Sequence, residues 1–450
     1  MPIGDINTIV TLVVFVAVIL AIALDLIDMV LAALLGVSVL IGFGIFNAQD
    51  ILNTTRTADG PIALLFGGMV VARTLKPTGL FDYIGTRYLL LTKGSGKRFL
   101  LGLILLVAPL CAVLPNATTV VLLAPIIIRV AVALEVDFVG PMVLTAIISN
   151  AAGLLTLVGD PATFLVGSGI GMTFNQYLQK VSLGGLLSVL VLIPFLPWLM
   201  RDVWNVRRTL PADLKAKPLE RPLLCALSLV VLALIVLLFI FGENIPTRIV
   251  PPAAAIVGAS LALLLTYGAK VEPVGKVLED IDWKTLLFLI CLFCLVEAIN
   301  KTGILQSLSH SLHGWFGVNL ILVALAVLAF VGFTSSLLAN VPVVAAMLLM
   351  LKSYSVIAEL VPEQALDPTF TAWPPNMIPV FVAMMFAGTL GGNATLIGSS
   401  ANVVAVGICA ANGKRVSFMQ FLRYGLPITL VQLGVSALYV LGLFYFTGRQ

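Results

Sequence analysis

Four clusters of small polar residues interrupt otherwise apolar stretches of this sequence, and they hold the side chains that could bind a solute. The first two clusters contain Asn116, Thr118, Thr119, Ser149, Asn150, Thr156 and Asp160. The other two contain Ser335, Ser336, Asn340, Asn393, Thr395, Ser399, Ser400 and Asn402. Their hydroxyls and amides, with backbone groups freed at such breaks, suit a small cation, an anion or a polar solute. The same side chains could cap interrupted helices, and a capping residue can still line a site.

Asp160 is the one acid in these clusters and lies between Gly159 and Pro161. A carboxylate at membrane depth is costly to bury and usually marks an ion or proton pathway. An Asp before a Pro is also a common cap at the start of a helix. We therefore predict that Asp160 carries a proton, with helix capping as the alternative role. Because catalysis usually needs a pair of such groups, a single acid argues against an enzyme.

The composition places these clusters in a membrane. Of the 450 residues, 60% are hydrophobic and 10% are charged, and the mean hydropathy is +1.13. A soluble domain carries roughly 25% charged residues. The net charge of +4 is small and scattered, which argues against a nucleic-acid partner. The five cysteines lie in apolar stretches, and the chain has no phosphate-binding loop. We expect no cofactor, no metal site, no enzymatic activity and no ATP-driven pumping by this chain.

Apolar runs predict ten membrane-spanning helices and two helical hairpins. The spans are expected near residues 8–25, 29–46, 61–76, 138–168, 180–201, 222–241, 249–267, 284–299, 372–410 and 417–446. The segments 98–133 and 317–351 are too long for one span and have a polar break in the middle. Each predicts a re-entrant hairpin that enters and leaves on one side, with two ordinary spans as the alternative. Spans 138–168 and 372–410 are also broken, which a membrane tolerates only where the backbone is buried in protein or lines a cavity.

The two halves of the sequence repeat one another. Residues 1–201 and 222–450 form the repeats, and 202–221 form a cytoplasmic connection between them. The matches include Thr78-Gly79 with Thr302-Gly303, Asn116 with Asn340, and Thr156-Leu157-Val158-Gly159 with Thr395-Leu396-Ile397-Gly398. Five spans per half is an odd number, so the second half is predicted to enter the membrane inverted. The connections 73–98, 201–221, 268–284 and 410–417 lie on one predicted side and hold seventeen basic residues, while the five connections on the other side hold five. This bias places the first side in the cytoplasm and both termini outside.

Several motifs in these segments resemble those of the ion transporter superfamily. They are Gly159-Asp160-Pro161, Asn116-Ala117-Thr118-Thr119, Ser335-Ser336 with Asn340-Val341-Pro342, Ser417-Phe418 with Gly425-Leu426-Pro427, and the stretch 391–404. The most similar branch is that of ArsB arsenite permeases, NhaD-type sodium/proton antiporters and the melanosomal P protein. The resemblance implies an all-α elevator-type transporter, in which elements 98–168 and 317–410 move against a scaffold of the remaining helices. It also implies a homodimer.

The chain departs from these relatives at its hairpin tips. Pro115-Asn116 and Ala339-Asn340 stand where the sodium/proton branch carries Asp-Asn, and Ala151 stands where a dicarboxylate branch carries threonine. We therefore expect efflux of arsenite or antimonite in exchange for protons, with Asp160 as the proton carrier. The alternatives are sodium- or proton-coupled transport of small anions such as dicarboxylates or sulfate, sodium/proton antiport, a channel and an intramembrane enzyme.

The transport hypothesis also predicts the location and the partners of the protein. We expect a multi-pass protein of the inner (plasma) membrane, in contact with the lipid bilayer. Its partners would be a small inorganic or organic ion as substrate and H⁺, or Na⁺, as the coupling ion. A cytoplasmic ATPase subunit is left open as a further partner.

Overall fold

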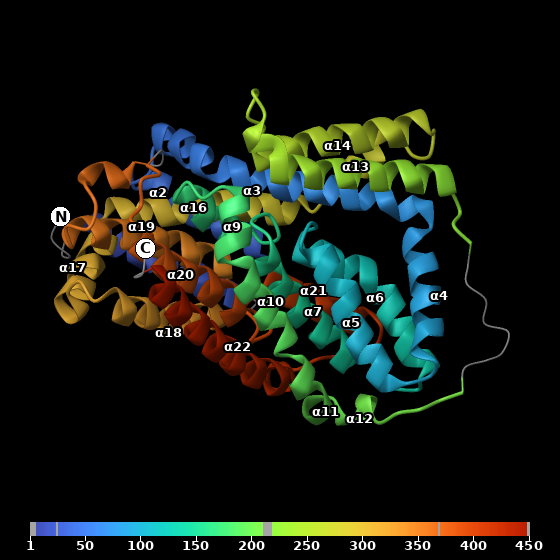
Figure 1. Cartoon of the computed structure of the whole chain (residues 1–450). Helices are drawn as coiled ribbons and strands as arrows, with labels where there is room; N and C mark the ends of the chain where they lie inside the picture. The colour runs from blue at the N-terminus through green and yellow to red at the C-terminus, as the bar shows by residue number, and fades with distance from the viewer. Residues whose placement is uncertain (1–5, 24–25, 210–217, 368–369, 448–450) are drawn as a thin grey trace.

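The computed structural model describes residues 6–23, 26–209, 218–367 and 370–447, and it is built of helices (Figure 1). Nine helices in this part of the chain are long and apolar enough to cross a membrane, and shorter apolar helices accompany them. The prediction of an all-α, polytopic membrane protein is confirmed. Part of the predicted connection 202–221, residues 210–217, lies outside the described residues.

The helices overlap every predicted span. Before the connection they are α1 (Ile6–Ala23), α2 (Met29–Gly42), α3 (Ala48–Leu75), α4 (Leu80–Thr92), α5 (Gly96–Cys111), α6 (Asn116–Ala133), α7 (Val139–Ala152), α8 (Pro161–Gly169), α9 (Phe174–Lys180), α10 (Ser182–Leu190), α11 (Leu196–Leu199) and α12 (Arg201–Trp204). After it they are α13 (Pro222–Phe241), α14 (Pro251–Gly268), α15 (Val274–Glu279), α16 (Trp283–Lys301), α17 (Ile304–Phe316), α18 (Leu320–Leu337), α19 (Asn340–Ile357), α20 (Ile378–Gly391), α21 (Ser400–Ala411) and α22 (Phe418–Thr447).

Several stretches are helical where the sequence predicts connections, and the three longest of them begin α3 and form α4 and α17. α3 begins at Ala48, because the side chains of Asn47 and Asp50 each accept the other's backbone N–H in a capping box. α4 and α17 begin directly after Gly79 and Gly303, whose φ angles are 74° and 77°. These left-handed angles favour glycine, so each chain turn can be sharp. Both helices bury one face, and this amphipathic pattern is hidden in a hydropathy average.

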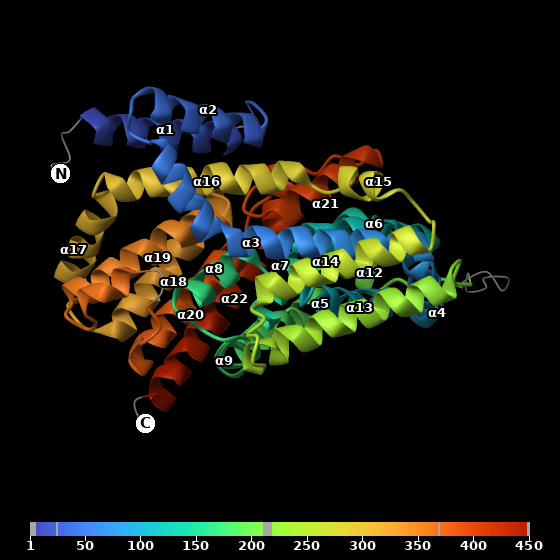
Figure 2. The same cartoon turned by 90° about the horizontal axis from the view of Figure 1, so that it is seen from above.

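Two groups of helices can be distinguished. α3, α13 and α14 lie side by side along one flank, and α1, α2 and α16 pack together beside the start of α3 (Figures 1 and 2). Gly67 permits close packing of α3 on α14, since a Cβ there would lie 2.6 Å from the carbonyl oxygen of Ala255. The second group contains α5 to α8 and α18 to α22, with α18 packed on α20 and α21 packed on α6 and α7.

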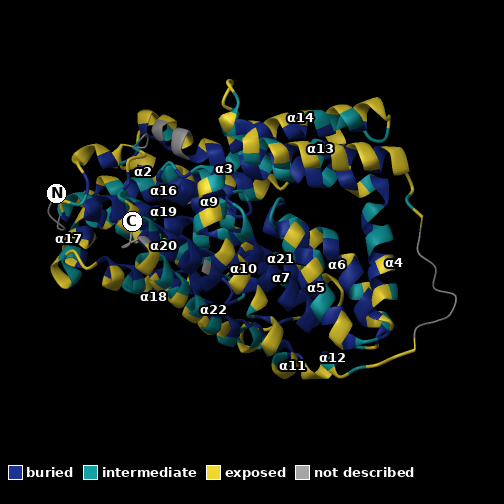
Figure 3. Ribbon diagram, in the orientation of Figure 1, coloured by how far each residue is buried: buried dark blue, intermediate teal, exposed yellow. Residues whose placement is uncertain are grey.

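The centre of the second group is buried. All residues of α7 are buried, and so are residues 379–391 of α20 (Figure 3). Buried polar side chains need hydrogen-bond partners, and most of these come from the protein itself. The partners found there therefore define the site.

Two helix pairs turn back on themselves where the sequence predicts hairpins. α5 and α6 are joined by residues 112–115, and α18 and α19 by residues 338–339. The residues before α6 and α19 are Pro115 and Ala339, and their φ angles are −55° and −57° with ψ of 139° in both. The hairpin tips thus share one backbone conformation, although one tip contains proline.

Two breaks in helices also have matching geometry. One lies between α7 and α8, and the other between α20 and α21. A Cβ on Gly159 would lie 2.6 Å from the carbonyl oxygen of Gly153, and a Cβ on Gly398 would lie 2.6 Å from that of Gly392. Only glycine fits such an approach of two backbone segments. The repeated glycines are therefore explained by the shape of the breaks.

Each hairpin is tied to the break of its own half by an equivalent hydrogen bond. The Thr156 hydroxyl donates to the backbone carbonyl of Ala112. In the second half, the Thr395 hydroxyl donates to the backbone carbonyl of Ser336. These threonines link the hairpin and the broken helix in each half.

Candidate functional site

Asp160 caps the start of α8. Its Oδ2 accepts the backbone N–H groups of Ala162 at 3.1 Å and Thr163 at 3.2 Å, and the residue is 3% exposed. The carboxylate thereby satisfies two of the free N–H groups at the helix start and lies at the positive end of its dipole. The capping role considered for Asp160 is real, and it leaves the other carboxylate oxygen available.

Three side chains from separate segments surround the Asp160 carboxylate. The hydroxyls of Thr163 and Thr389 lie 3.5 Å and 3.4 Å from Oδ2, and the Asn340 amide donates to Oδ1 at 3.4 Å. Thr389 belongs to α20 and Asn340 begins α19, so both halves of the chain contribute. No ion pair involves Asp160 within the described residues. We name Asp160, Thr163, Thr389 and Asn340 the acid centre.

A second polar group, without a charge, surrounds Ser399. The Ser399 hydroxyl accepts the backbone N–H of Ala401 at 3.2 Å, as a cap of α21, and donates to Oδ1 of Asn150 at 2.8 Å. Asn150 in turn donates to Oδ1 of Asn393 at 2.9 Å and of Asn402 at 3.1 Å. We name Ser399, Asn402, Asn150 and Asn393 the neutral centre.

The neutral centre is closed by further hydrogen bonds. Asn402 donates to the carbonyls of Gly392 and Thr395, both at 2.8 Å. Asn393 donates to Oε1 of Gln432 at 2.9 Å, and Gln432 donates to the carbonyl of Ser188 at 2.9 Å. The side chains of the neutral centre thus bond to other groups of the protein. Their hydrogen bonds connect α7, α20, α21 and α22 to one another.

The two centres occupy positions that correspond at one constant offset in the sequence. Asp160 corresponds to Ser399, Thr163 to Asn402, and Asn150 to Thr389, each pair being 239 positions apart. Thr156 and Thr395 have the same separation. Each centre therefore contains a residue that caps a helix, a side chain about one turn further along that helix, and a residue from the broken helix of the other half of the chain.

The tip of the first hairpin lies beside the acid centre. A Cβ on Gly153 would lie 3.2 Å from Nδ2 of Asn116 and 3.0 Å from Cβ of Asp160, so both residues flank this glycine. Oδ1 of Asn116 is buried and has no hydrogen-bond partner among the described residues. A buried acceptor without a partner is unusual and is commonly satisfied by water, an ion or a ligand. The geometry therefore adds Asn116 to the surroundings of Asp160.

Most of the other predicted site residues donate hydrogen bonds to backbone carbonyls, and the rest lie outside both centres. Ser149, Ser335 and Ser336 donate to backbone carbonyls of Ala146, Gly388 and Phe333, and Thr156 and Thr395 make the ties described above. Thr118 and Ser400 belong to neither centre, and Ser400 is exposed. Thr119 is buried on the first hairpin. Thr163, Thr389 and Gln432 lie within helices and escaped the sequence prediction, although the 239-position offset links two of them to predicted residues.

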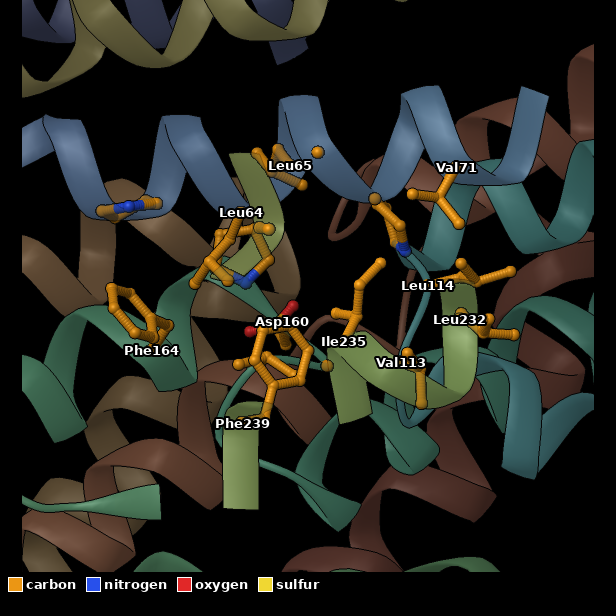
Figure 4. A pocket seen from close by; sticks show the side chains of 18 residues that line it. Leu64, Leu65, Val71, Val113, Leu114, Asp160, Phe164, Leu232, Ile235 and Phe239 are labelled. Carbon is orange, nitrogen blue, oxygen red and sulfur yellow. The ribbon is translucent and has the colours of Figure 1, made fainter. Parts of the chain in front are cut away.

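Asp160 also lines a small cavity between the two groups of helices. α3, α13 and α14 form one wall through residues such as Leu64, Leu65 and Ile235, and the first hairpin tip forms the other (Figure 4). The cavity has a volume of about 20 Å³. This is room for roughly one water molecule. The walls are mostly apolar, so Asp160 is the polar feature that a solute would meet.

A much larger vestibule lies beside this cavity. Its volume is about 1240 Å³, and its lining includes the charged residues Asp59, Glu243, Arg248, Glu297 and Lys352. The lining comes from the start of α3, the α13–α14 connection, the end of α16, α8 and α19. The sequence predicts the first three of these segments on the same side as both termini. The vestibule and the small cavity share the residues Pro61 and Phe164.

An all-helical membrane protein with interrupted helices around a buried acid has the build of a multi-pass transporter. Residues 15–374 match the family model described as "CitMHS: Citrate transporter", and the chain belongs to this family. The matched region includes both hairpins, the first break and the acid centre up to Asn340, and it ends before the second break.

Curated relatives agree with this class. The chain is 42% identical over 433 residues to "Uncharacterized transporter slr0753" of Synechocystis, with 96% of each chain covered. It is 31% identical over 439 residues to "Uncharacterized transporter Rv2684" of Mycobacterium tuberculosis, with 96% of this chain and 98% of that protein covered. It is 27% identical to the human P protein, over 84% of this chain and 53% of that protein. The chain is thus a membrane transporter. The P protein is a member of the branch that the motifs indicate, whereas no ArsB arsenite permease is among these three relatives.

Proposed function

We propose that this chain is a secondary active transporter in which Asp160 binds the coupling proton. The observation that carries the proposal is a buried carboxylate with no basic partner among the described side chains, at the boundary between two helix groups. Its side-chain contacts of 3.4 to 3.5 Å are long for hydrogen bonds. The neighbouring side chains are thus loosely bound, while the backbone N–H groups of Ala162 and Thr163 hold the carboxylate in place. The side-chain neighbours can therefore be exchanged at little cost when the carboxylate takes up a proton.

The proposed substrate is a small carboxylate anion, moved together with a proton. Two observations support this class: the family description names citrate, and the starts of α6, α8 and α19 meet at Asn116, Asp160 and Asn340. Helix starts attract anions through their free N–H groups and dipoles. An anion beside ionised Asp160 would be repelled, so it binds best when Asp160 is protonated. The geometry thereby favours symport of anion and proton.

Arsenite is the second candidate substrate. The groups around Asp160 are hydroxyls and amides without a lysine or arginine, and they match a neutral, hydroxyl-rich solute such as As(OH)₃. In that case Asp160 would exchange its proton against the solute during efflux. Sodium coupling and sodium/proton antiport are outcomes that the same experiment separates.

The proposed architecture is an inverted repeat that works as an elevator in a homodimer. The matching hairpin tips, breaks and threonine ties support the repeat. Ion pairs between distant segments support the predicted sides: Arg73 pairs with Asp280 at 2.6 Å, and Lys301 pairs with Asp50 at 2.5 Å. Arg208 with Glu135 and Lys284 with Asp28 likewise join segments predicted on one side. Both termini outside the plasma membrane remain part of this proposal.

Transport in proteoliposomes with an imposed pH or sodium gradient tests the proposal. Labelled citrate, succinate and arsenite are compared in the unchanged chain, in Asp160→Asn, and in Asp59→Asn as a control acid from the vestibule. We expect accumulation of a carboxylate driven by the pH gradient, falling on the order of 100-fold in Asp160→Asn and little in Asp59→Asn. Uptake driven by sodium alone, or unchanged in Asp160→Asn, would contradict the proton role. Transport of arsenite without transport of citrate or succinate would show that the substrate is arsenite and not a carboxylate.

A further inference from the structure

One aromatic ring separates the two hollow spaces of the molecule. Phe164 lines both the Asp160 cavity and the vestibule, and it is 5% exposed. It lies on α8, four positions after Asp160, and its backbone N–H donates to the Asp160 carbonyl at 3.0 Å. The acid and the ring therefore lie on one face of the helix, a single turn apart (Figure 4).

The wall facing the ring consists of glycine and proline from α3 and α14. A Cβ on Gly60 would lie 2.7 Å from Cε1 of Phe164 and 3.5 Å from Cγ of Pro252. Gly60 has no side chain, and the rings of Pro61 and Pro252 cannot swing aside by a χ1 rotation. The phenyl ring fills the notch between them, and a rotamer change of Phe164 is the simplest movement that opens it.

We propose that Phe164 is the gate between the vestibule and the Asp160 cavity. Its ring must leave the notch made by Gly60, Pro61 and Pro252 before a solute can pass from the vestibule to the acid. An apolar ring at a constriction holds back hydrated ions, because they would have to shed water to pass it. The gate is attached one turn from the proton carrier, so a shift of α8 on solute binding moves both.

A matched residue distinguishes a gate from ordinary packing. Leu165 is the next residue on α8, is 4% exposed and lines the vestibule, but it does not line the Asp160 cavity. Truncating either side chain removes buried apolar volume from the same helix. Only truncation of Phe164 removes the partition between the two spaces.

Thiol labelling from the vestibule side tests the gate without any transport substrate. Leu64 lines the Asp160 cavity and not the vestibule, so Leu64→Cys places a reporter behind the gate. A membrane-impermeant methanethiosulfonate reagent is added to right-side-out and to everted vesicles. The unchanged chain, in which all five cysteines are buried, serves as the control for background labelling.

We expect Phe164→Ala to label the reporter about tenfold faster from the vestibule side, which corresponds to about 1.4 kcal/mol less work to open the path. Leu165→Ala should leave the rate unchanged. If Phe164→Ala fails to reach the membrane, Phe164→Leu makes the same comparison with less lost volume. Equal rates in the Phe164 and Leu165 variants would overturn the gate. A failed proton or substrate assignment would not alter these rates, so the two proposals fail separately.

Discussion

The acid centre and the neutral centre occupy equivalent positions but are bonded differently. The side-chain hydrogen bonds of Asn150 to Ser399, Asn393 and Asn402 measure 2.8 to 3.1 Å. Those that reach the Asp160 carboxylate from other side chains measure 3.4 to 3.5 Å. The first range is normal for strong hydrogen bonds and the second is long. The same arrangement of residues thus occurs twice. In the neutral centre it joins helices through short hydrogen bonds, and in the acid centre it surrounds a carboxylate with long side-chain contacts.

The largest expected effect comes from making the two centres alike. Asp160→Ser places the cap of the neutral centre in the acid centre, which keeps a helix cap but removes the charge. We expect proton-driven transport in proteoliposomes to fall on the order of 100-fold. The matched variant Ser399→Ala removes a cap from the neutral centre and should keep most of the transport per folded molecule. Equal losses in the two variants would contradict the division of roles.

A large stability effect is expected in the neutral centre. Asn150→Ala would leave the Ser399 hydroxyl and the amide oxygens of Asn393 and Asn402 without their donor or acceptor in a buried place. We expect a loss of about 3 kcal/mol in the free energy of unfolding, since unpaired buried polar groups are costly. Unfolding in mixed detergent micelles measures it. Asn412→Ala, at an exposed amide that donates to the carbonyl of Ile408, should change stability by less than about 0.5 kcal/mol.

The smallest effect is expected from a hydroxyl of the acid centre. Thr389→Val keeps the shape of the side chain and removes one long contact to Asp160 and one to Thr163 at 3.2 Å. We expect a loss of about 1 kcal/mol in the same unfolding measurement. A loss as large as that of Asn150→Ala would mean that the acid centre is as tightly bonded as the neutral centre, and the comparison would not hold.

Much of the fold was predictable because burial in a membrane leaves a simple signal. Apolar runs gave the spans, and the polar breaks at 114–119 and 338–342 marked the turns between α5 and α6 and between α18 and α19. The amphipathic helices α4 and α17 were missed because averaging hydropathy along the chain hides a one-sided apolar face. The early start of α3 was missed because its first turns are polar.

The residue types of the candidate site were predictable from the sequence, but the pairs of side chains that bond to one another were not. Asp160, Asn150 and Ser399 stood out as polar residues in apolar runs. The side chains that complete the acid centre, Thr163 and Thr389, lie inside regular helices, where threonine usually bonds to its own backbone. The hydrogen bonds of Asn150 span more than 240 positions of sequence. Such pairs depend on how helices cross, which no local pattern specifies.

Among the described residues no countercharge lies beside Asp160, and this has an electrical consequence. The two centres together carry one negative charge when Asp160 is ionised and none when it is protonated. Moving one elementary charge across a potential of 100 mV costs or releases about 2.3 kcal/mol. In the proposed cycle, membrane voltage would therefore act on the step in which the deprotonated, empty centre moves. A protonated centre that holds a carboxylate carries the charge of that solute and responds as well, whereas a protonated centre without a solute is neutral. Current recordings could therefore report which form of the site crosses the field.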